Sequence, residues 1–221
     1  MRQISLDTET TGLFYYQGHR IIEIGCVEII DRKITKNTFQ AYINPERLID
    51  NDAKKITGLT DLFLKDKPLF KNVVNIFLNF IKDADEIIIH NAPFDINFIN
   101  NEFKIINHDI KNIKHNFKIF DTLELARKLH PGKKNNLDAL CMRYNISLSE
   151  RKIHGALLDA ELLAKVYLAM TENEENYENK KSNIVNDLTL NENIEILKAN
   201  KQELNSHITY IKNLQEQIRI I

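Results

Sequence analysis

Apolar and β-branched residues occur in the first 90 positions in short runs of the kind that form β-strands. Residues 20–30 and 38–43 form two such runs, separated by a short polar turn, and residues 4–7 form an earlier one. Residues 86–90 are a continuous apolar run, which is typical of a buried strand. The pattern therefore predicts three consecutive strands and, after a gap, a fourth.

Apolar residues spaced three and four positions apart predict helices around the later strands. Residues 70–81 and 94–103 each carry one apolar helical face, and residues 118–121 are a candidate last strand. Further helical patterns follow at residues 123–129, 137–144 and 156–170. Three strands followed by alternating helices and strands predict an α/β fold, a mixed β-sheet with helices on its faces.

The composition of the chain changes near residue 171. All six glycines and all four prolines lie at or before Gly155, and residues 172–187 are rich in Glu, Asn and Lys, which favours a flexible linker. One apolar helical stripe follows, formed by Leu204, Ile208, Ile211, Leu214 and Ile218. Because a lone helix cannot bury such a stripe, we expect a domain over residues 1–171, a linker over 172–187 and a partner-binding helical tail over 188–221.

The overall composition is that of a soluble globular protein, with 43% hydrophobic and 28% charged residues and a formal net charge of −1. The near-neutral charge argues against a protein that coats duplex DNA with a basic stripe. Cys26 and Cys141 are far apart in sequence, so neither a disulfide framework nor a zinc site is indicated. With no signal-peptide core and no long apolar run, the sequence favours a cytoplasmic location.

Acidic residues mark the end of the first strand and the starts of two helices. Asp7 and Glu9 are two positions apart, so a strand would place both carboxylates on one face, where they repel unless a cation joins them. Asp95 falls near a helix start, just past a buried strand, which is where α/β proteins place ligand-binding groups. The alternatives are an exposed acidic strand end, and a plain helix-dipole contact for Asp95 of about 0.3–1 kcal/mol.

A histidine and a further acid mark the start of the last helix of the domain. His154 stands beside Gly155, on a turn that would let the imidazole approach a water, and Asp159 lies within the first turns. The alternative for His154 is an ordinary polar surface group. Four acids and one histidine match two hard divalent cations, Mg²⁺ or Mn²⁺, which take oxygen ligands and lie about 4 Å apart. The chemistry indicated is phosphodiester hydrolysis.

Three ordered motifs resemble those of the DEDDh exonucleases, which have a ribonuclease H-like fold: D-T-E at residues 7–9, N-A-P-F-D at 91–95 and H-G-A-L-L-D at 154–159. Within that family the chain resembles the epsilon, or proofreading, subunits of bacterial DNA polymerase III. The further stretches that carry this resemblance are residues 20–25, 66–68, 126–128, 136–141 and 167–171.

The resemblance implies a role for each acid. Asp7 would bridge two divalent metal ions, Glu9 and Asp159 would complete the first metal site, and Asp95 would hold the second, largely through water. His154 would act as the general base that deprotonates the attacking water.

The resemblance also implies substrate-binding residues. Leu13 would wedge against the terminal bases, and Asn91 and Phe94 would line the pocket of the 3′ nucleotide. Thr57 stands where related proteins often carry a histidine, so a contact to the terminal nucleotide would be made differently.

Residues 196–204 resemble the segment with which epsilon subunits hold the polymerase. The expected function is thus a two-metal 3′→5′ exonuclease that proofreads single-stranded or frayed 3′ ends of DNA in the bacterial replisome. Its tail would bind the catalytic subunit of DNA polymerase III, with a small accessory subunit as a further partner. The alternatives are a free-standing DEDDh exoribonuclease or oligonucleotidase, and a non-catalytic interaction module that retains the fold.

Overall fold

The computed structural model of the protein describes residues 1–149 and 153–188, with side chains described as far as Glu172. The backbone divides after Asn173 into two units. The fold of the first unit, Met1–Asn173, positions every candidate site residue.

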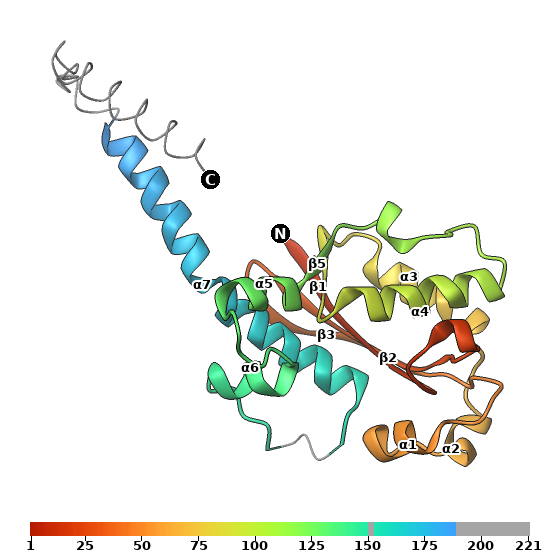
Figure 1. The fold of residues 1–221 in the computed structure, drawn as a ribbon. Coiled ribbons are helices and arrows are strands. Elements are labelled where there is room, and N and C mark those ends of the chain that lie inside the picture. The colour runs from red at the N-terminus through yellow and green to blue at the C-terminus, as the bar shows by residue number, and fades with distance from the viewer. Residues whose placement is uncertain (150–152, 189–221) are drawn as a thin grey trace, which may run out of the picture. The chain divides into compact units, whose positions relative to one another are not determined.

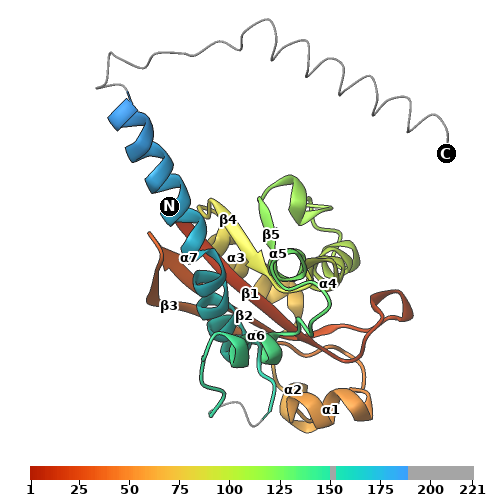
Figure 2. The ribbon, with the colours of Figure 1, turned by 60° about the vertical axis from the view of Figure 1, so that its left-hand side comes forward.

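The centre of this unit is a five-stranded mixed sheet with the strand order β3-β2-β1-β4-β5. Strand β1 pairs antiparallel with β2, as β2 does with β3, whereas β1 pairs parallel with β4, as β4 does with β5. The carboxyl ends of β1, β4 and β5 therefore meet at one edge of the sheet. Figure 1 shows the sheet, and Figure 2 labels β4, which lies between β1 and β5. The strands are β1 (Arg2–Thr10), β2 (Ile21–Ile30), β3 (Lys33–Tyr42), β4 (Glu86–Ile89) and β5 (Ile119–Asp121).

Helices cover both faces of the sheet, which confirms the predicted α/β class. Helices α3 (Phe70–Ile81) and α4 (Ala92–Ile105) pack on one face, and α5 (Thr122–Leu129), α6 (Leu137–Arg143) and the first part of α7 (Ala156–Leu188) on the other (Figure 2).

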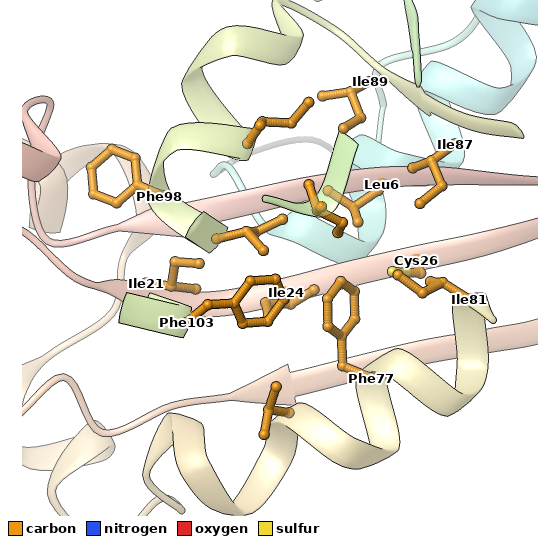
Figure 3. Packing of buried hydrophobic residues seen from close by; sticks show 14 of the residues in the cluster. Leu6, Ile21, Ile24, Cys26, Phe77, Ile81, Ile87, Ile89, Phe98 and Phe103 are labelled. Carbon is orange, nitrogen blue, oxygen red and sulfur yellow. The ribbon is translucent and has the colours of Figure 1, made fainter. Parts of the chain in front are cut away.

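Two apolar clusters, one on each face, join the helices to the sheet. In the first, Leu6 and Ile24 of the sheet meet Phe77 of α3 and Phe103 of α4 (Figure 3). In the second, side chains of β2 and β4 meet the three helices of the other face, through Val27, Ile29, Ile88, Ala126, Leu140, Leu163 and Val166. Because β2 contributes to both clusters, nearly every residue of this strand is buried.

Two short helices were not predicted from the sequence. Helix α1 (Asn51–Thr57) has seven residues and α2 (Asp61–Lys65) has five, too few to show a clear apolar period. Single-turn 3-10 helices at Tyr15–Gln17 and Ile113–His115 were also missed. All four are held by tertiary contacts rather than by a helical pattern of their own.

Several boundaries differ from the prediction, most of all at β3, which begins at Lys33 rather than at residue 38. Strand β1 continues to Thr10, so Asp7 and Glu9 lie within the strand rather than at its end. Helix α4 begins at Ala92, two residues before the predicted start, and Pro93 lies in its first turn. A proline fits there because the first helical N–H groups have no partner within the helix.

Helix α7 runs on to Leu188, through residues 172–187, whose composition favours a linker. A flexible linker there stays a prediction. The predicted tail, residues 188–221, lies outside the described residues except for Leu188. No helix in the described part of the chain combines the length and apolar character needed to cross a membrane.

Candidate active site

The acids of β1 lie at the edge of the sheet where the parallel strands end. Asp7 and Glu9 are partly buried and, with an alternation of two, point to the face of the sheet that α7 covers. Their partners on β2 are Gly25 and Glu23. Residues directly opposite each other in an antiparallel pair point to the same side, so Glu23 shares this face.

Asp95 reaches the same edge from α4 and is tied to the residue between the two strand acids. Its Oδ1 accepts hydrogen bonds from the Thr8 backbone N at 3.0 Å and from Thr8 Oγ1 at 2.6 Å. The residue is only 3% exposed, and this burial raises the pKa of Asp95 to about 7, although the Thr8 hydrogen bonds act in the opposite direction. A buried carboxyl with a raised pKa is a frequent mark of a functional site.

The start of α7 brings the other two groups to Glu9. His154 Nδ1 lies 3.2 Å from Asp159 Oδ2, with 43% of the His154 side chain exposed and 5% of that of Asp159. Ligand atoms of Glu9, His154 and Asp159 all lie within 4.8 Å of one another, a spacing at which they could hold a cation. The two carboxylates are the kind of donor that a hard divalent ion takes, whereas the imidazole is typical of softer ions.

The structure thus brings Glu9, His154 and Asp159 into one cluster, with Asp95 tied to the neighbouring Thr8. Asp7 is not a member of that three-residue cluster, but its place two residues before Glu9 puts it on the same face. The residue set fits a site for divalent cations, since two carboxylates lie in the cluster, Asp7 shares its face, and Asp95 is bonded to the residue between the two strand acids.

Glu23 of β2 fixes the start of α7, and sequence reasoning gave it no role. It is 2% exposed, and its Oε2 accepts a hydrogen bond from the Ala156 backbone N at 3.1 Å, while Oε1 accepts from Gln40 Nε2 at 2.8 Å. A carboxylate at a helix N-terminus satisfies an unpaired N–H and interacts favourably with the helix dipole. The available signal was an acid inside a buried apolar run, which β2 contains twice, at Glu23 and Glu28.

Close packing at Gly25 holds the same helix start against the sheet. A Cβ atom at this position would lie 2.2 Å from the backbone of Ala156 and Leu157. Only a residue without a side chain therefore lets α7 approach the strand so closely. Because His154 and Asp159 are carried by this helix start, Gly25 sets their distance from the acids of β1.

Helix α1 anchors His154 from the other side. The His154 backbone N donates to the Ile56 carbonyl at 3.0 Å. Next to this contact Ile153 packs on Gly58, which has a left-handed φ of 68°. His154 is therefore held between α1 and the Glu23 anchor at Ala156.

A cavity of about 570 Å³ opens beside Glu9, and three predicted substrate-binding residues line it: Leu13, Thr57 and Phe94. Leu13 is 68% exposed, and the Phe94 ring lies 5.0 Å from that of Phe98. The Thr57 hydroxyl donates to the Ala53 carbonyl and accepts from the Leu59 N–H, so its hydrogen bonds stay within its own segment.

Asn91 is not in this cavity. It precedes α4 with a left-handed φ of 63° and lines a second cavity with His90, Arg127 and Lys133. Its backbone N donates to Asp121 Oδ1 at 3.0 Å, and Asp121 also accepts from Ala92 N. Asp121, which sequence reasoning did not single out, thus fixes the start of α4.

Residues 4–167 match the exonuclease family model RNase_T. The DNA polymerase III subunit epsilon of Buchnera aphidicola subsp. Schizaphis graminum is 51% identical over 232 residues, covering 98% of each chain. The subunit of the same name from Escherichia coli K12 is 52% identical over 174 residues, which cover 77% of this chain and 71% of that protein.

Solved structures show the same fold. Exonuclease X in complex with 5′ overhanging duplex DNA matches with a TM-score of 0.59 and 28% identity, over 78% of this chain and 91% of that one. The nuclease domain of 3′hExo, a DEDDh family member bound to rAMP, matches with a TM-score of 0.67 over 78% and 92%. At 16% identity, this second likeness supports the fold alone.

Proposed function

The chain belongs to the exonuclease family and, within it, to the DNA polymerase III epsilon subunits, and we propose that Asp7, Glu9, Asp95, Asp159 and His154 are its catalytic site. The reaction is the 3′→5′ hydrolysis of a terminal phosphodiester bond. The observation that carries the proposal is the cluster of Glu9, His154 and Asp159, whose ligand atoms lie within 4.8 Å of one another.

Each residue of the site has a distinct task. When bound, two divalent cations, Mg²⁺ or Mn²⁺, lower the pKa of the attacking water and stabilise the attacking and leaving oxygens of the phosphodiester. Glu9 and Asp159 would hold one cation, Asp95 the other, and Asp7 both. His154 keeps much of its side chain in solvent, so it is the group of the cluster that can take the proton of the attacking water.

The cavity beside Glu9 would receive the 3′-terminal nucleotide. Its volume of about 570 Å³ is within the usual range for a small-molecule site. Exposed Leu13 would wedge against the terminal base, and Phe94 would pack on the nucleotide. A mismatched end costs less to unpair and so enters more readily, which favours proofreading.

The direct test is digestion of 5′-labelled single-stranded DNA and RNA, with Mg²⁺ or Mn²⁺ and then with a chelator. We expect shortening of DNA from the 3′ end that stops when the chelator is added. Strong RNA turnover together with no affinity for a polymerase would favour the free-standing exoribonuclease or oligonucleotidase. No turnover with either cation would favour a non-catalytic interaction module.

The polymerase partner is tested by truncation. Arg32 donates to Thr171 Oγ1 at 2.9 Å and to the Leu168 carbonyl at 2.8 Å, so the shortened chain should end at Asn173 to keep these contacts. We expect it to keep nuclease activity but to lose co-elution with the catalytic subunit of DNA polymerase III from its own organism. Leu204→Asp should give an intermediate loss, because it places a charge in a dry contact. Equal polymerase affinity of the short and full chains would contradict the role of the tail.

The cellular setting follows from the same family. A DNA polymerase III subunit works on the chromosome in the bacterial cytoplasm, with the 3′ end of single-stranded DNA as substrate. A small accessory subunit is a further proposed partner, and co-purification of the full-length chain from its own organism would identify it.

A further inference from the structure

A second cavity, of about 650 Å³, opens at the carboxyl end of β4. Strand β4 lies next to β1 in the sheet and parallel to it, with Ser5 paired to Ile88. Asp7 and His90 each lie two residues beyond that pair. Since neighbouring strands are about 4.8 Å apart, the cavity begins roughly one strand away from the acids of β1. The two cavities share no lining residue.

The charges around the two cavities are opposite in sign. Glu9, Asp50 and Asp52 line the nucleotide cavity, and no Lys or Arg does so among the described residues. Arg127 and Lys133 line the second cavity, which has no Asp or Glu among its described lining residues. A phosphate of a substrate strand is therefore repelled at the first cavity until cations bind, and attracted at the second.

The two positively charged side chains at the second cavity, Arg127 and Lys133, are free to take a ligand. Both side chains belong to exposed residues, and within the described part of the chain neither Arg127 nor Lys133 forms a side-chain hydrogen bond or an ion pair. Residues 125–137 contain four Lys and Arg, at 127, 128, 133 and 134, and no Asp or Glu. The chain has a net charge of only −1, so this segment is a local concentration of positive charge.

Hydrogen bonds fix the backbone segments that carry Arg127 and Lys133. His90 Nδ1 and Thr122 Oγ1 lie 2.9 Å apart, which ties the end of β4 to the start of α5. The buried Asn135 side chain donates to the His130 carbonyl at 3.2 Å and accepts from Arg143 at 3.1 Å, which closes the loop between α5 and α6. A fixed frame lowers the entropy that binding would cost.

We propose that the second cavity binds backbone phosphates of the single strand upstream of the scissile bond, with Arg127 and Lys133 as the contacts. The inference rests on the proposed nuclease function and deepens it. Arg127 offers a planar fork that matches two phosphate oxygens, and Lys133 offers a point charge. The site adds affinity for an oligonucleotide and none for a mononucleotide derivative, which fills the nucleotide cavity alone.

The test compares two substrates in Arg127→Ala/Lys133→Ala. The p-nitrophenyl ester of thymidine 5′-monophosphate reaches only the nucleotide cavity, whereas a 5′-labelled single strand of eight nucleotides reaches both. Lys36→Ala/Lys71→Ala is the matched control, since it removes the same charge from exposed residues on β3 and α3, away from the parallel-strand edge. Thermal melting checks that each variant is folded.

The expected result is a raised KM for the eight-nucleotide strand, with ester hydrolysis unchanged within about twofold. Each phosphate contact to a single strand adds about 0.7 to the slope of log affinity against log salt, so losing two lowers the slope by about 1.4. Between 50 and 200 mM salt, that change corresponds to about a sevenfold smaller loss of affinity.

Three outcomes would overturn the inference: an unchanged KM and salt slope for the strand, an equal loss in the control, or an equal loss on the ester. If the wild-type protein hydrolyses neither substrate, it is the proposed function that fails. Charge reversal in Arg127→Glu should raise the KM further. A fourth outcome would also overturn the inference: the double variant binds an acidic protein more weakly than the wild type does, while its turnover of the single strand is unchanged.

Discussion

Substituting Gly25 by alanine tests whether the distance between α7 and the sheet sets the geometry of the site. The added Cβ would lie 2.2 Å from the backbone of Ala156 and Leu157, whereas ordinary contact begins at 3.4 Å. The helix start and the strand must therefore separate by about 1.2 Å, and both contacting groups are backbone, which cannot rotate away. His154 and Asp159 would move with the helix.

Two effects of different size are expected. Overpacking costs about 1–3 kcal/mol of the free energy of unfolding, which lowers the Tm by about 2–12 °C in a domain of this size. A misplacement of about 1 Å at a catalytic group costs on the order of 10²-fold in rate. At a temperature where the variant is fully folded, the kcat for single-stranded DNA should therefore fall by about two orders of magnitude.

The assay is steady-state digestion of 5′-labelled single-stranded DNA, with the folded fraction measured by circular dichroism. Gly155→Ala is the control, because a Cβ there meets only Glu23 Oε2, at 3.9 Å, and its rate should stay within a few-fold of the wild type. A Gly25→Ala protein with wild-type kcat and Tm would refute the link between this contact and the site.

Four further predictions concern single groups. Asp7→Ala should abolish cleavage and leave the Tm of the metal-free protein unchanged or higher, because one of several crowded carboxylates is removed; near-wild-type turnover would exclude Asp7 as a ligand. His154→Ala should cost about 10²–10⁴ in rate, because it removes the group proposed to take the proton of the attacking water; turnover at the wild-type rate would exclude His154 as the general base. Burial raises the pKa of Asp95 to about 7, so the folded metal-free protein holds a proton there that the unfolded chain has lost. The protein's free energy of unfolding should therefore fall as pH rises from about 4 to about 7. Mn²⁺ binding should release a proton in the same pH range. Calorimetry should find neither effect in Asp95→Asn. Burial also raises the thiol pKa values of Cys26 and Cys141, the latter to about 11, so neither thiol should react with a thiol reagent at about pH 8 until the protein unfolds.

The sequence by itself predicted the strands of the sheet and the longer helices, and it indicated the acids that carry the proposed chemistry. A period of two placed Asp7 and Glu9 on one face of β1, and apolar residues at helical spacing predicted α3 over the range found, Phe70–Ile81. These features depend on backbone geometry within a few residues, which any window of the sequence displays. The order of strands and helices was enough to predict a mixed sheet with helices on both faces.

Tertiary structure alone decided how the site is held together. The bond from Ala156 to Glu23 spans 133 residues, and that from Thr8 to Asp95 spans 87. It also separated Asn91 from Phe94, although only two residues lie between them, because α4 begins there and turns the two side chains toward different cavities. Such contacts depend on which strands pair and on where each chain segment crosses the sheet. The local spacing of apolar residues determines neither the strand pairing nor the crossings.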